Sequence, residues 1–442
     1  MDTISESDGI NLAIDAILNA RLALLCGAGL SRAAPSSLPT AADVAQAAKA
    51  KYDAFYGSAR DPLPVDISEQ AEFFFARGEL ATQYLTTYVD RHAFAGQPNP
   101  GHEAVADLLL AHGIETAVST NVDRLIELAG ELQHGDIGAG IDVAAMSQLP
   151  AGVAPLLKVH GCWTIDRAHT VWAPGQVTSE PTASRLSDSA NWITTRLLNC
   201  DLLIVGYYTD WAYLNSALER SLGAVHPARV IVVDPTDGAW LATKAPALNA
   251  LGGRAQSAFL HVQQSGAVFL DRLRQSFAAS FVRQALRGAA AAYQLRHGTA
   301  PDPASLEPVI GDNLTLWLIR RDLEGALPGR PVSRREPYDE PMVGLTILEL
   351  RARGATPSGS AWLLDGKTIR VLRTANQLLH LIQAAFVGET PPIVTTDIVI
   401  AVGADSSPLP TSIVRGRMPG SIVRPGTGRW LTRSDAVTEF AL

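Results

Sequence analysis

Short runs of consecutive apolar residues recur along the N-terminal part of the chain, and each ends in a polar residue or a glycine. Continuous apolar runs without alternation are typical of parallel strands that are buried on both faces. Helical periodicity separates most of these runs, for example at 101–113 and 122–132. The alternation predicts an α/β domain with a doubly wound, Rossmann-like parallel sheet. The predicted strands are Leu22–Cys26, Thr116–Ser119, Leu156–Val159, Asp201–Gly206 and Ala228–Asp234.

Two helical patterns follow the first predicted strand, at 41–57 and 68–92, and a segment with two prolines separates them. Proline removes a backbone donor and disfavours a continuous helix, so the separating segment is predicted to be a loop. These patterns predict a helical insertion over about 41–95 that covers one face of the sheet.

The α/β pattern fades after about residue 270, where a long helix is predicted at 270–298. Strands are predicted at 314–319 and 344–350, a helix at 374–386, and Gly/Pro-rich turns near the C-terminus. We therefore predict a doubly wound domain over 1–275, followed by a smaller α+β domain over 276–442.

Composition narrows the class of protein. The chain has 36 Lys and Arg against 44 Asp and Glu, and this formal net charge of −8 gives no electrostatic footprint for duplex DNA on its own. A local basic patch, or nucleic acid held by a partner, stays open. The cysteines Cys26, Cys162 and Cys200 form no C-x-x-C pair, so neither a structural zinc site nor a disulfide framework is predicted. With no basic signal segment and no apolar run of membrane length, we expect a cytoplasmic protein without a membrane partner.

The glycine-rich turn after the first predicted strand is a candidate for binding phosphate. Gly27, Ala28, Gly29 and Ser31 follow a strand, and glycine loops let backbone N–H groups close on an anion. A tight turn that connects a strand to a helix and binds no ligand explains the same residues equally well.

Polar residues also end the other predicted strands. Asn121 and Asp123 could face a ligand crevice, or they could cap the helix that follows. His160 could act as a general base, or it could be a core histidine whose ring nitrogens are hydrogen-bonded within the protein. Because ligands of doubly wound sheets bind at the carboxyl ends of the strands, features at five such ends indicate one shared site. The candidates here are Ser119, Asn121, Asp123, His160, Gly206 and Asp234.

The order of these motifs resembles the sirtuin superfamily over roughly the first 270 residues. The motifs are GAGLS, PNPGHEAVADL, STNVD, KVHG, VGYYTD and VIVVD. The resemblance implies an NAD-binding catalytic domain over 1–275. It places Ala28 and Ser31 on the dinucleotide phosphates, Asn121 and Asp123 near the nicotinamide ribose, His160 as the catalytic histidine and Asp234 near the adenosine ribose.

The chain also departs from the family. Typical protein deacylases of the family carry a zinc ribbon of two C-x-x-C pairs, and their glycine loop continues as GIPDFR; this chain has neither. Thr120 stands where the family often has glutamine, and Tyr208 stands near a usual serine. In these respects the chain resembles the divergent bacterial sirtuin-like proteins of anti-phage systems, many of which degrade NAD.

That resemblance implies an NAD glycohydrolase that acts as a defence effector by depleting NAD, with NAD as substrate and no zinc. Asn121 would place water or the ribose hydroxyls, and His160 would accept a proton. Two alternatives stay open: a protein deacylase or ADP-ribosyltransferase, and a non-catalytic module that binds NAD or ADP-ribose. As partners we expect further copies of the chain, joined through the C-terminal domain, and a HerA-like hexameric ATPase. The rival partner is a short Argonaute with guide nucleic acid.

Overall fold

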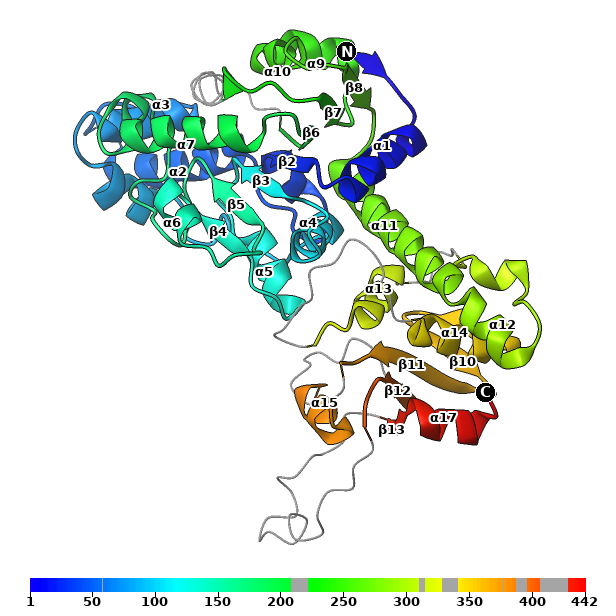
Figure 1. The fold of residues 1–442 in the computed structure, drawn as a ribbon. Coiled ribbons are helices and arrows are strands. Elements are labelled where there is room, and N and C mark those ends of the chain that lie inside the picture. The colour runs from blue at the N-terminus through cyan, green and yellow to red at the C-terminus, as the bar shows by residue number, and fades with distance from the viewer. Residues whose placement is uncertain are drawn as a thin grey trace, which may run out of the picture. The chain divides into compact units, whose positions relative to one another are not determined.

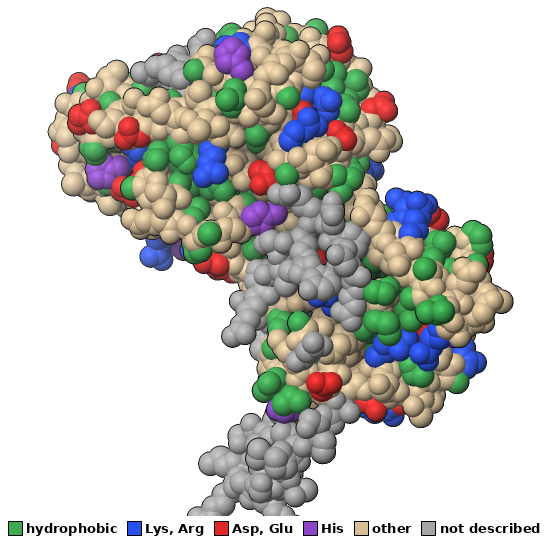
Figure 2. Space-filling view, in the orientation of Figure 1, with side chains coloured by type: hydrophobic (Ala, Val, Ile, Leu, Met, Phe, Trp, Pro, Cys, Tyr) green, Lys and Arg blue, Asp and Glu red, His purple; other side chains and the backbone are tan. Residues whose placement is uncertain are grey.

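The chain folds into two compact units in the computed structural model, which describes residues 1–57, 59–207, 222–309, 315–327, 341–375, 377–386, 396–405 and 428–442. The N-terminal unit comprises Met1–Glu131 and Asp136–Leu273, and the C-terminal unit comprises Leu132–Gly135 and Arg274–Leu442. Over the face that Figure 2 shows, charged side chains of both signs are scattered. None of the helices that the structure describes combines the length and the apolar surface needed to cross a lipid bilayer.

The N-terminal unit is built on an eight-stranded sheet in the order β1-β8-β7-β6-β2-β3-β5-β4, and every neighbouring pair is parallel. The predicted α/β class and the five predicted strands are therefore confirmed. The strands are β1 (Asp2–Thr3), β2 (Leu22–Cys26), β3 (Thr116–Ser119), β4 (Gly138–Gly140), β5 (Pro155–Lys158), β6 (Asp201–Val205), β7 (Arg229–Val233) and β8 (Ala258–Val262).

Helices lie on both sides of this sheet (Figure 1). Apolar side chains of the central strands pack on one face against α6, α7, α9 and α10, while α1 packs against β2 and β6. The helix α4 begins where the Asn99 side chain accepts hydrogen bonds from the Gly101 and His102 N–H groups, with Pro100 at its first position. The bounds are α1 (Glu6–Leu18), η1 (Ala28–Arg32), α4 (Pro100–Leu110), α5 (Leu125–Leu132), α6 (Val143–Ser147), η3 (Pro174–Thr178), α7 (Thr182–Arg196), α9 (Gly238–Lys244) and α10 (Pro246–Gly252).

The predicted helical insertion consists of α2 (Ala41–Tyr56), α3 (Ile67–Phe75) and the π-helix η2 (Leu80–Tyr88). Its core is aromatic: the rings of Phe74 and Tyr84 stack with their centroids 5.1 Å apart. The same apolar cluster includes Trp163 and Trp172, which come from the chain after β5. The insertion is thus fastened to the segment that follows His160.

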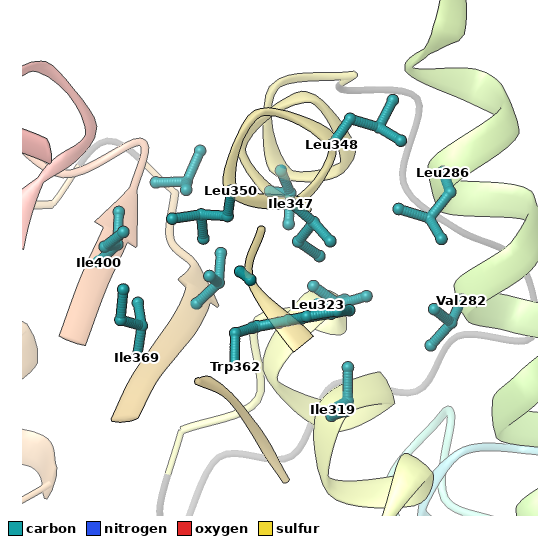
Figure 3. Close-up of a cluster of buried hydrophobic side chains, with 14 of the residues drawn as sticks. Val282, Leu286, Ile319, Leu323, Ile347, Leu348, Leu350, Trp362, Ile369 and Ile400 are labelled. Atoms are coloured by element: carbon teal, nitrogen blue, oxygen red, sulfur yellow. The ribbon is translucent and has the colours of Figure 1, made fainter. Parts of the chain in front are cut away.

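The C-terminal unit holds a five-stranded mixed sheet in the order β13-β12-β11-β10-β9. Figure 3 shows its core, in which side chains of α11, α13 and α14 meet Trp362, Ile369 and Ile400 of the sheet. The helix α11 (Gly266–Gly288) begins in the N-terminal unit and enters the C-terminal unit at Arg274. The other elements are α12 (Ala290–His297), η4 (Pro303–Leu306), α13 (Leu316–Glu324), α14 (Met342–Ala352), β9 (Thr356–Ser358), β10 (Ala361–Leu364), β11 (Lys367–Arg373), α15 (Leu379–Phe386), β12 (Ile398–Val402), β13 (Arg429–Thr432) and α17 (Arg433–Phe440).

Two strand predictions in this unit are wrong. The segments 314–319 and 344–350 contribute to the helices α13 and α14 as far as the structure describes them. All residues of α14 from Val343 to Leu350 are buried, so its sequence lacks a polar stripe. A short apolar run without a stripe fits a buried strand or a buried helix equally well, because no period distinguishes the two. The helix predicted within 374–386 is confirmed as α15.

Candidate functional site

The strand order of the N-terminal unit reverses between β2 and β6. From β2 the chain goes on to β3 on one side, and from β6 it goes on to β7 on the other side, although β2 and β6 are neighbours. In open parallel sheets, ligands bind at the carboxyl ends of the strands where the order reverses. The loops at this position begin at Gly27, after β2, and at Gly206, after β6.

The glycines of these two loops allow their backbones to touch. A Cβ on Gly29 would lie 2.8 Å from the Gly206 Cα, and a Cβ on Gly27 would lie 2.6 Å from the Gly206 carbonyl oxygen. Gly206 has φ +60°, and a Cβ there would lie 2.5 Å from the backbone nitrogen of Leu30. Only glycine fits at this crossing without a shift of backbone.

At this crossing, two of the backbone N–H groups that were predicted to bind phosphate are hydrogen-bonded to the end of β6 and the loop after it instead. The Gly27 N–H donates to the Val205 carbonyl at 3.0 Å, and the Gly29 N–H donates to the Gly206 carbonyl at 2.9 Å. Among the described residues, no group accepts from the Ala28 N–H, and Ala28 is exposed. Ala28 is therefore the position in this turn that offers a backbone donor to an anion.

We expect Gly206→Ala to destabilise the N-terminal unit more than Gly57→Ala. Both glycines have a positive φ, +60° and +56°, but a Cβ on Gly57 meets nothing within 4 Å. The control should cost about 1–3 kcal/mol, because φ +56° with ψ −128° is a backbone conformation that residues other than glycine rarely adopt. Gly206→Ala should cost roughly 2 kcal/mol more because backbone atoms must move. Urea unfolding of the two variants measures the difference, and equal losses would contradict a tight crossing.

Ser31 is the centre of a buried hydrogen-bond network. Its Oγ donates to Asp123 Oδ2 at 2.9 Å and accepts from Asn121 Nδ2 at 3.1 Å. The third contact of Oγ is with His102 Nε2 at 3.1 Å. Because the Asn99 N–H donates to His102 Nδ1 at 3.2 Å, the proton of the neutral ring is on Nε2 and points to Ser31. Ser31 Oγ is thus engaged by three protein groups, and a direct contact of this hydroxyl with a phosphate stays a prediction.

The network fixes the direction of the Asn121 carboxamide. The Ser31 hydroxyl gives its proton to Asp123, so the group of Asn121 that faces Ser31 is the amide nitrogen. Asn121 is 4% exposed, and its Oδ1 has no hydrogen-bond partner among the described residues. A buried acceptor without a donor costs about 1–3 kcal/mol. This oxygen is therefore poised to accept a hydrogen bond from a ligand hydroxyl or a water.

His160 presents a neutral ring at the end of the neighbouring strand β5. Its Nδ1 lies 3.3 Å from the Thr120 carbonyl oxygen, which can only accept, so Nδ1 carries the proton and Nε2 keeps its lone pair. Burial lowers the pKa of His160 to about 4, against the smaller opposing effect of the Thr120 carbonyl. The ring is thus uncharged at neutral pH and offers Nε2 as a proton acceptor.

The buried histidines predict an acid-sensitive fold. Burial lowers the pKa of His102 to about 4 as well, whereas an unfolded histidine titrates near 6.5. Below pH 6.5 the unfolded chain therefore binds protons first, and stability is lost as the pH falls toward 4. We expect each histidine to lower the free energy of unfolding by up to about 1.4 kcal/mol per pH unit in this window. Urea unfolding at pH 7, 6 and 5 measures the slope; His160→Gln should reduce it, and the exposed His92→Gln should not.

A buried lysine links the strands that carry Asn121 and His160. Lys158 Nζ donates to the backbone carbonyl of Asp123 and, at 2.9 Å, to Glu127 Oε1. The side chain of Lys158 is 1% exposed and that of Glu127 is 9% exposed. Burial lowers the pKa of Lys158, but the Glu127 carboxylate and other neighbours outweigh it and raise this pKa above the usual value. The pair ties β5 to the segment after β3.

Ser119 adjoins the hydrogen-bond network around Ser31, whereas Asp234 lies at the end of another strand. Ser119 Oγ accepts from the Asn121 N–H at 3.1 Å, so Ser119 supports the backbone of the asparagine. Asp234 follows β7, and its Oδ1 accepts from the N–H and the hydroxyl of Thr236 at 2.9 and 2.5 Å. Asp234 Oδ2 makes no hydrogen bond to a described residue.

The structure places all predicted site residues at the carboxyl ends of five adjacent strands, β7, β6, β2, β3 and β5. It brings Ser31, Asn121 and Asp123 into contact, and it links His160 to them through the Thr120 carbonyl. Tyr208 and the rest of its motif lie outside the described residues.

Three residues of the site, Asn99, His102 and Lys158, lie in motifs that the sequence analysis quotes but were given no role there. Asn99 and His102 stand three residues apart at a helix start, a spacing in which the N-cap side chain and the third helical side chain bond to each other's backbone. That spacing could have marked them as a pair, but the contact of His102 with Ser31 joins residues 71 positions apart.

No protein-family model matches the chain, and no curated protein matches it in sequence. Solved structures of Sir2 homologues are similar to part of it. A Sir2 homologue in complex with NAD is 16% identical, with 60% of this chain and 91% of that chain covered and a TM-score of 0.29. A mutant Sir2 homologue in complex with ADP-ribose is 17% identical, with 59% and 93% covered and a TM-score of 0.31. A Sir2 complex with an inhibitor, 2′-O-acetyl-ADP-ribose and a deacetylated p53 peptide is 14% identical, with 60% and 98% covered and a TM-score of 0.31.

Proposed function

We propose that the chain is an NAD glycohydrolase, which cleaves the bond between nicotinamide and ribose C1′ with water. The observation that supports this proposal is the order of groups along one edge of the sheet. Asp234 follows β7, the glycine turn follows β2 in the middle, and Asn121 and His160 follow β3 and β5. A dinucleotide has the same order, with a riboside on each side of a central pyrophosphate. The five strand ends span four intervals of about 4.8 Å, or about 19 Å, which suits an extended dinucleotide.

The polar atoms along this edge that have no partner among the described residues fit such a ligand. Asn121 Oδ1 and Asp234 Oδ2 are acceptors, and ribose hydroxyls are donors. The Ala28 N–H is a donor at the middle of the edge, where a pyrophosphate would lie. Each free group of the site therefore has a counterpart of opposite hydrogen-bonding character in NAD.

The residues near β3 and β5 support hydrolysis at C1′. When the C1′–N bond breaks, nicotinamide leaves as a neutral molecule with the bonding electron pair, and the ribosyl group becomes cationic. Water then bonds to C1′ and gives a proton to Nε2 of His160, so the products are nicotinamide, ADP-ribose and one proton. Water that attacks a cation is strongly acidic, and for this reason a base whose pKa is about 4 is sufficient. Asn121 Oδ1 would hold the water or a ribose hydroxyl in place.

Incubation of the purified chain with NAD alone tests the proposal. We expect nicotinamide and ADP-ribose to be released in equal amounts, and chromatography of the reaction mixture measures both products. A deacylase would release nicotinamide only after an acylated peptide is added, and a binding module would bind ADP-ribose without turnover. Either result would contradict the hydrolase. The protein encoded beside it should be included in a second arm, since an enzyme that destroys NAD has to be restrained in its own cell.

We expect chelation to leave both activity and thermal stability unchanged. Among the described residues, no group of three or more His, Cys, Asp or Glu could hold a metal ion, and the proposed hydrolysis assigns no step to one. The measurement is nicotinamide release and the melting temperature before and after dialysis against a chelator. Stoichiometric zinc in protein purified without chelator, together with loss of activity on its removal, would contradict this expectation.

Self-association through the C-terminal unit and docking on a HerA-like hexameric ATPase stay proposals. Light scattering of the isolated chain measures the first, and co-purification with the ATPase measures the second. A monomer that instead co-purifies with a short Argonaute and guide nucleic acid would favour the rival partner.

A further inference from the structure

We propose that Arg185 is a positioning residue for His160: its guanidinium clamps the loop 161–170, which is closed on the backbone of that histidine, and it sets a positive charge near the ring. A positive charge there favours the form of the ring that accepts a proton. The inference rests on the proposed hydrolysis only in that His160 is the base of that reaction.

The loop 161–170 is closed at its base on the backbone of His160. The Val171 N–H donates to the His160 carbonyl at 2.8 Å. Gly161 has φ +91° and passes so close to the end of the loop that a Cβ on it would lie 2.9 Å from the Thr170 Cα. A displacement of this loop therefore also moves the backbone that carries the His160 ring.

Arg185 holds this loop from the helix α7. Its Nη2 donates to the His169 carbonyl at 2.9 Å, a contact between residues sixteen positions apart in the chain. The loop is also bonded within itself, because His169 Nδ1 lies 2.9 Å from Asp166 Oδ2. The guanidinium thus grips a loop whose own side chains already fix its shape.

The helix α7 does not itself require an arginine at position 185. Arg185 is the fourth residue of α7 and lies near the positive end of the helix dipole, where a cation is unfavourable. Arg196, in the last turn of the same helix, lies at the favourable end. The contacts of the guanidinium therefore explain Arg185 better than the stability of the helix does.

Within the part of the chain that the structure describes, no ion pair neutralises Arg185. Asp166, a carboxylate of the clamped loop, is engaged by His169 instead. Arg185 Nε is buried and has no hydrogen-bond partner among the described residues. Burial lowers the pKa of Arg185 and the charges of Asp166 and Asp142 oppose this effect, but an arginine in a protein stays protonated.

This charge acts on His160 against protonation. Burial is the main cause of the low pKa of His160, about 4; the Thr120 carbonyl opposes it, and Arg185 lowers the pKa further. Of the charged side chains in the described ranges, Arg185 is the one that acts on the ring. After water has given its proton to Nε2, the imidazolium lies near a guanidinium without an ion pair. It therefore returns the proton to solvent, and the base is ready for the next turnover.

The test compares two variants that remove the charge, Arg185→Met and Arg185→Gln, with Arg185→Lys, which keeps a charge and a donor. NMR of carbon-13-labelled histidine follows the His160 ring in the full chain between about pH 7.5 and 4.5, and His160→Gln assigns its signal. We expect the charge-free variants to raise the midpoint of the His160 titration by about half a pH unit or more, and Arg185→Lys to leave it within about 0.3 units. Amide hydrogen exchange over 161–171 should become about tenfold faster in Arg185→Met.

Arg196→Met is the matched control, because it removes the same charge from an exposed position of the same helix. It should change neither the His160 midpoint nor the exchange of the loop. In the hydrolysis assay, the acidic limb of kcat/KM should move to higher pH together with the NMR midpoint in the charge-free variants. A clamp without an electrostatic effect would lower kcat/KM and leave the position of this limb unchanged.

An unchanged His160 midpoint in the folded charge-free variants would overturn the proposal, and so would unchanged exchange of the loop in Arg185→Met. Both readouts are independent of whether the chain hydrolyses NAD. A raised midpoint and faster exchange, in a chain whose wild type releases no nicotinamide, would support the positioning of the ring and overturn the hydrolase.

Discussion

His160→Ala and Asn121→Ala should each slow the release of nicotinamide from NAD by at least about 100-fold, which is the lower end of the contribution of a positioned acid–base group. His160 offers the only nitrogen of its ring that still has a lone pair, because Nδ1 faces the Thr120 carbonyl. Asn121 offers a buried oxygen that no described residue satisfies. Removing either group removes an interaction that the reacting water or ribose would make.

The two variants should differ in how they bind ADP-ribose. His160→Ala removes the proton acceptor, so affinity should stay within a few fold of the wild-type value. Asn121→Ala also removes a contact to the ligand, and it leaves Ser31 Oγ with one donor fewer, so affinity should fall. Circular dichroism should be unchanged in both, and the exposed His92→Ala is the control. Near-full turnover of His160→Ala would show that the assignment of the base is wrong.

Lys158→Met should lower the free energy of unfolding of the N-terminal unit by about 3–5 kcal/mol, the usual cost of leaving one charge of a buried pair without its partner. The side chains of Lys158 and Glu127 are 1% and 9% exposed, and the Nζ–Oε1 distance is 2.9 Å. The variant also loses the hydrogen bond from Nζ to the carbonyl of Asp123. Water cannot replace these bonds readily in the interior.

A second substitution separates the charge effect from the loss of packing. Glu127→Leu in the Lys158→Met background replaces the ion pair by two apolar side chains and should recover most of the loss. The partly exposed pair of Lys49 and Asp53, whose side chains are 30% and 50% exposed and whose N–O distance is 3.2 Å, is the control; Lys49→Met should change stability by about 1 kcal/mol or less. A loss of less than 1 kcal/mol in Lys158→Met would contradict a structural ion pair beneath the site.

The hydrophobic pattern was sufficient to predict the five central strands, because strands such as β2 and β6 are buried on both faces and therefore read as unbroken apolar runs. It was not sufficient for β4, a Gly-Ala-Gly segment without an apolar signature, which is a strand only because β5 pairs with it. It also failed for α14, where burial on all sides erases the helical period. An unbroken apolar run therefore reports burial, but it does not say whether the buried segment is a strand or a helix.

The sequence by itself determined that glycines, amides, acids and a histidine stand at strand ends, and the parallel sheet guarantees that such ends share one edge. Only the tertiary structure decided what each group does there. The Gly27 and Gly29 N–H groups are taken by the strand end of β6, and Asn121 turns its oxygen away from Ser31 because the hydroxyl proton goes to Asp123. The direction of a hydrogen bond depends on which atoms lie opposite each other. That arrangement follows from strand order and loop approach between residues far apart in the chain, which no local pattern encodes.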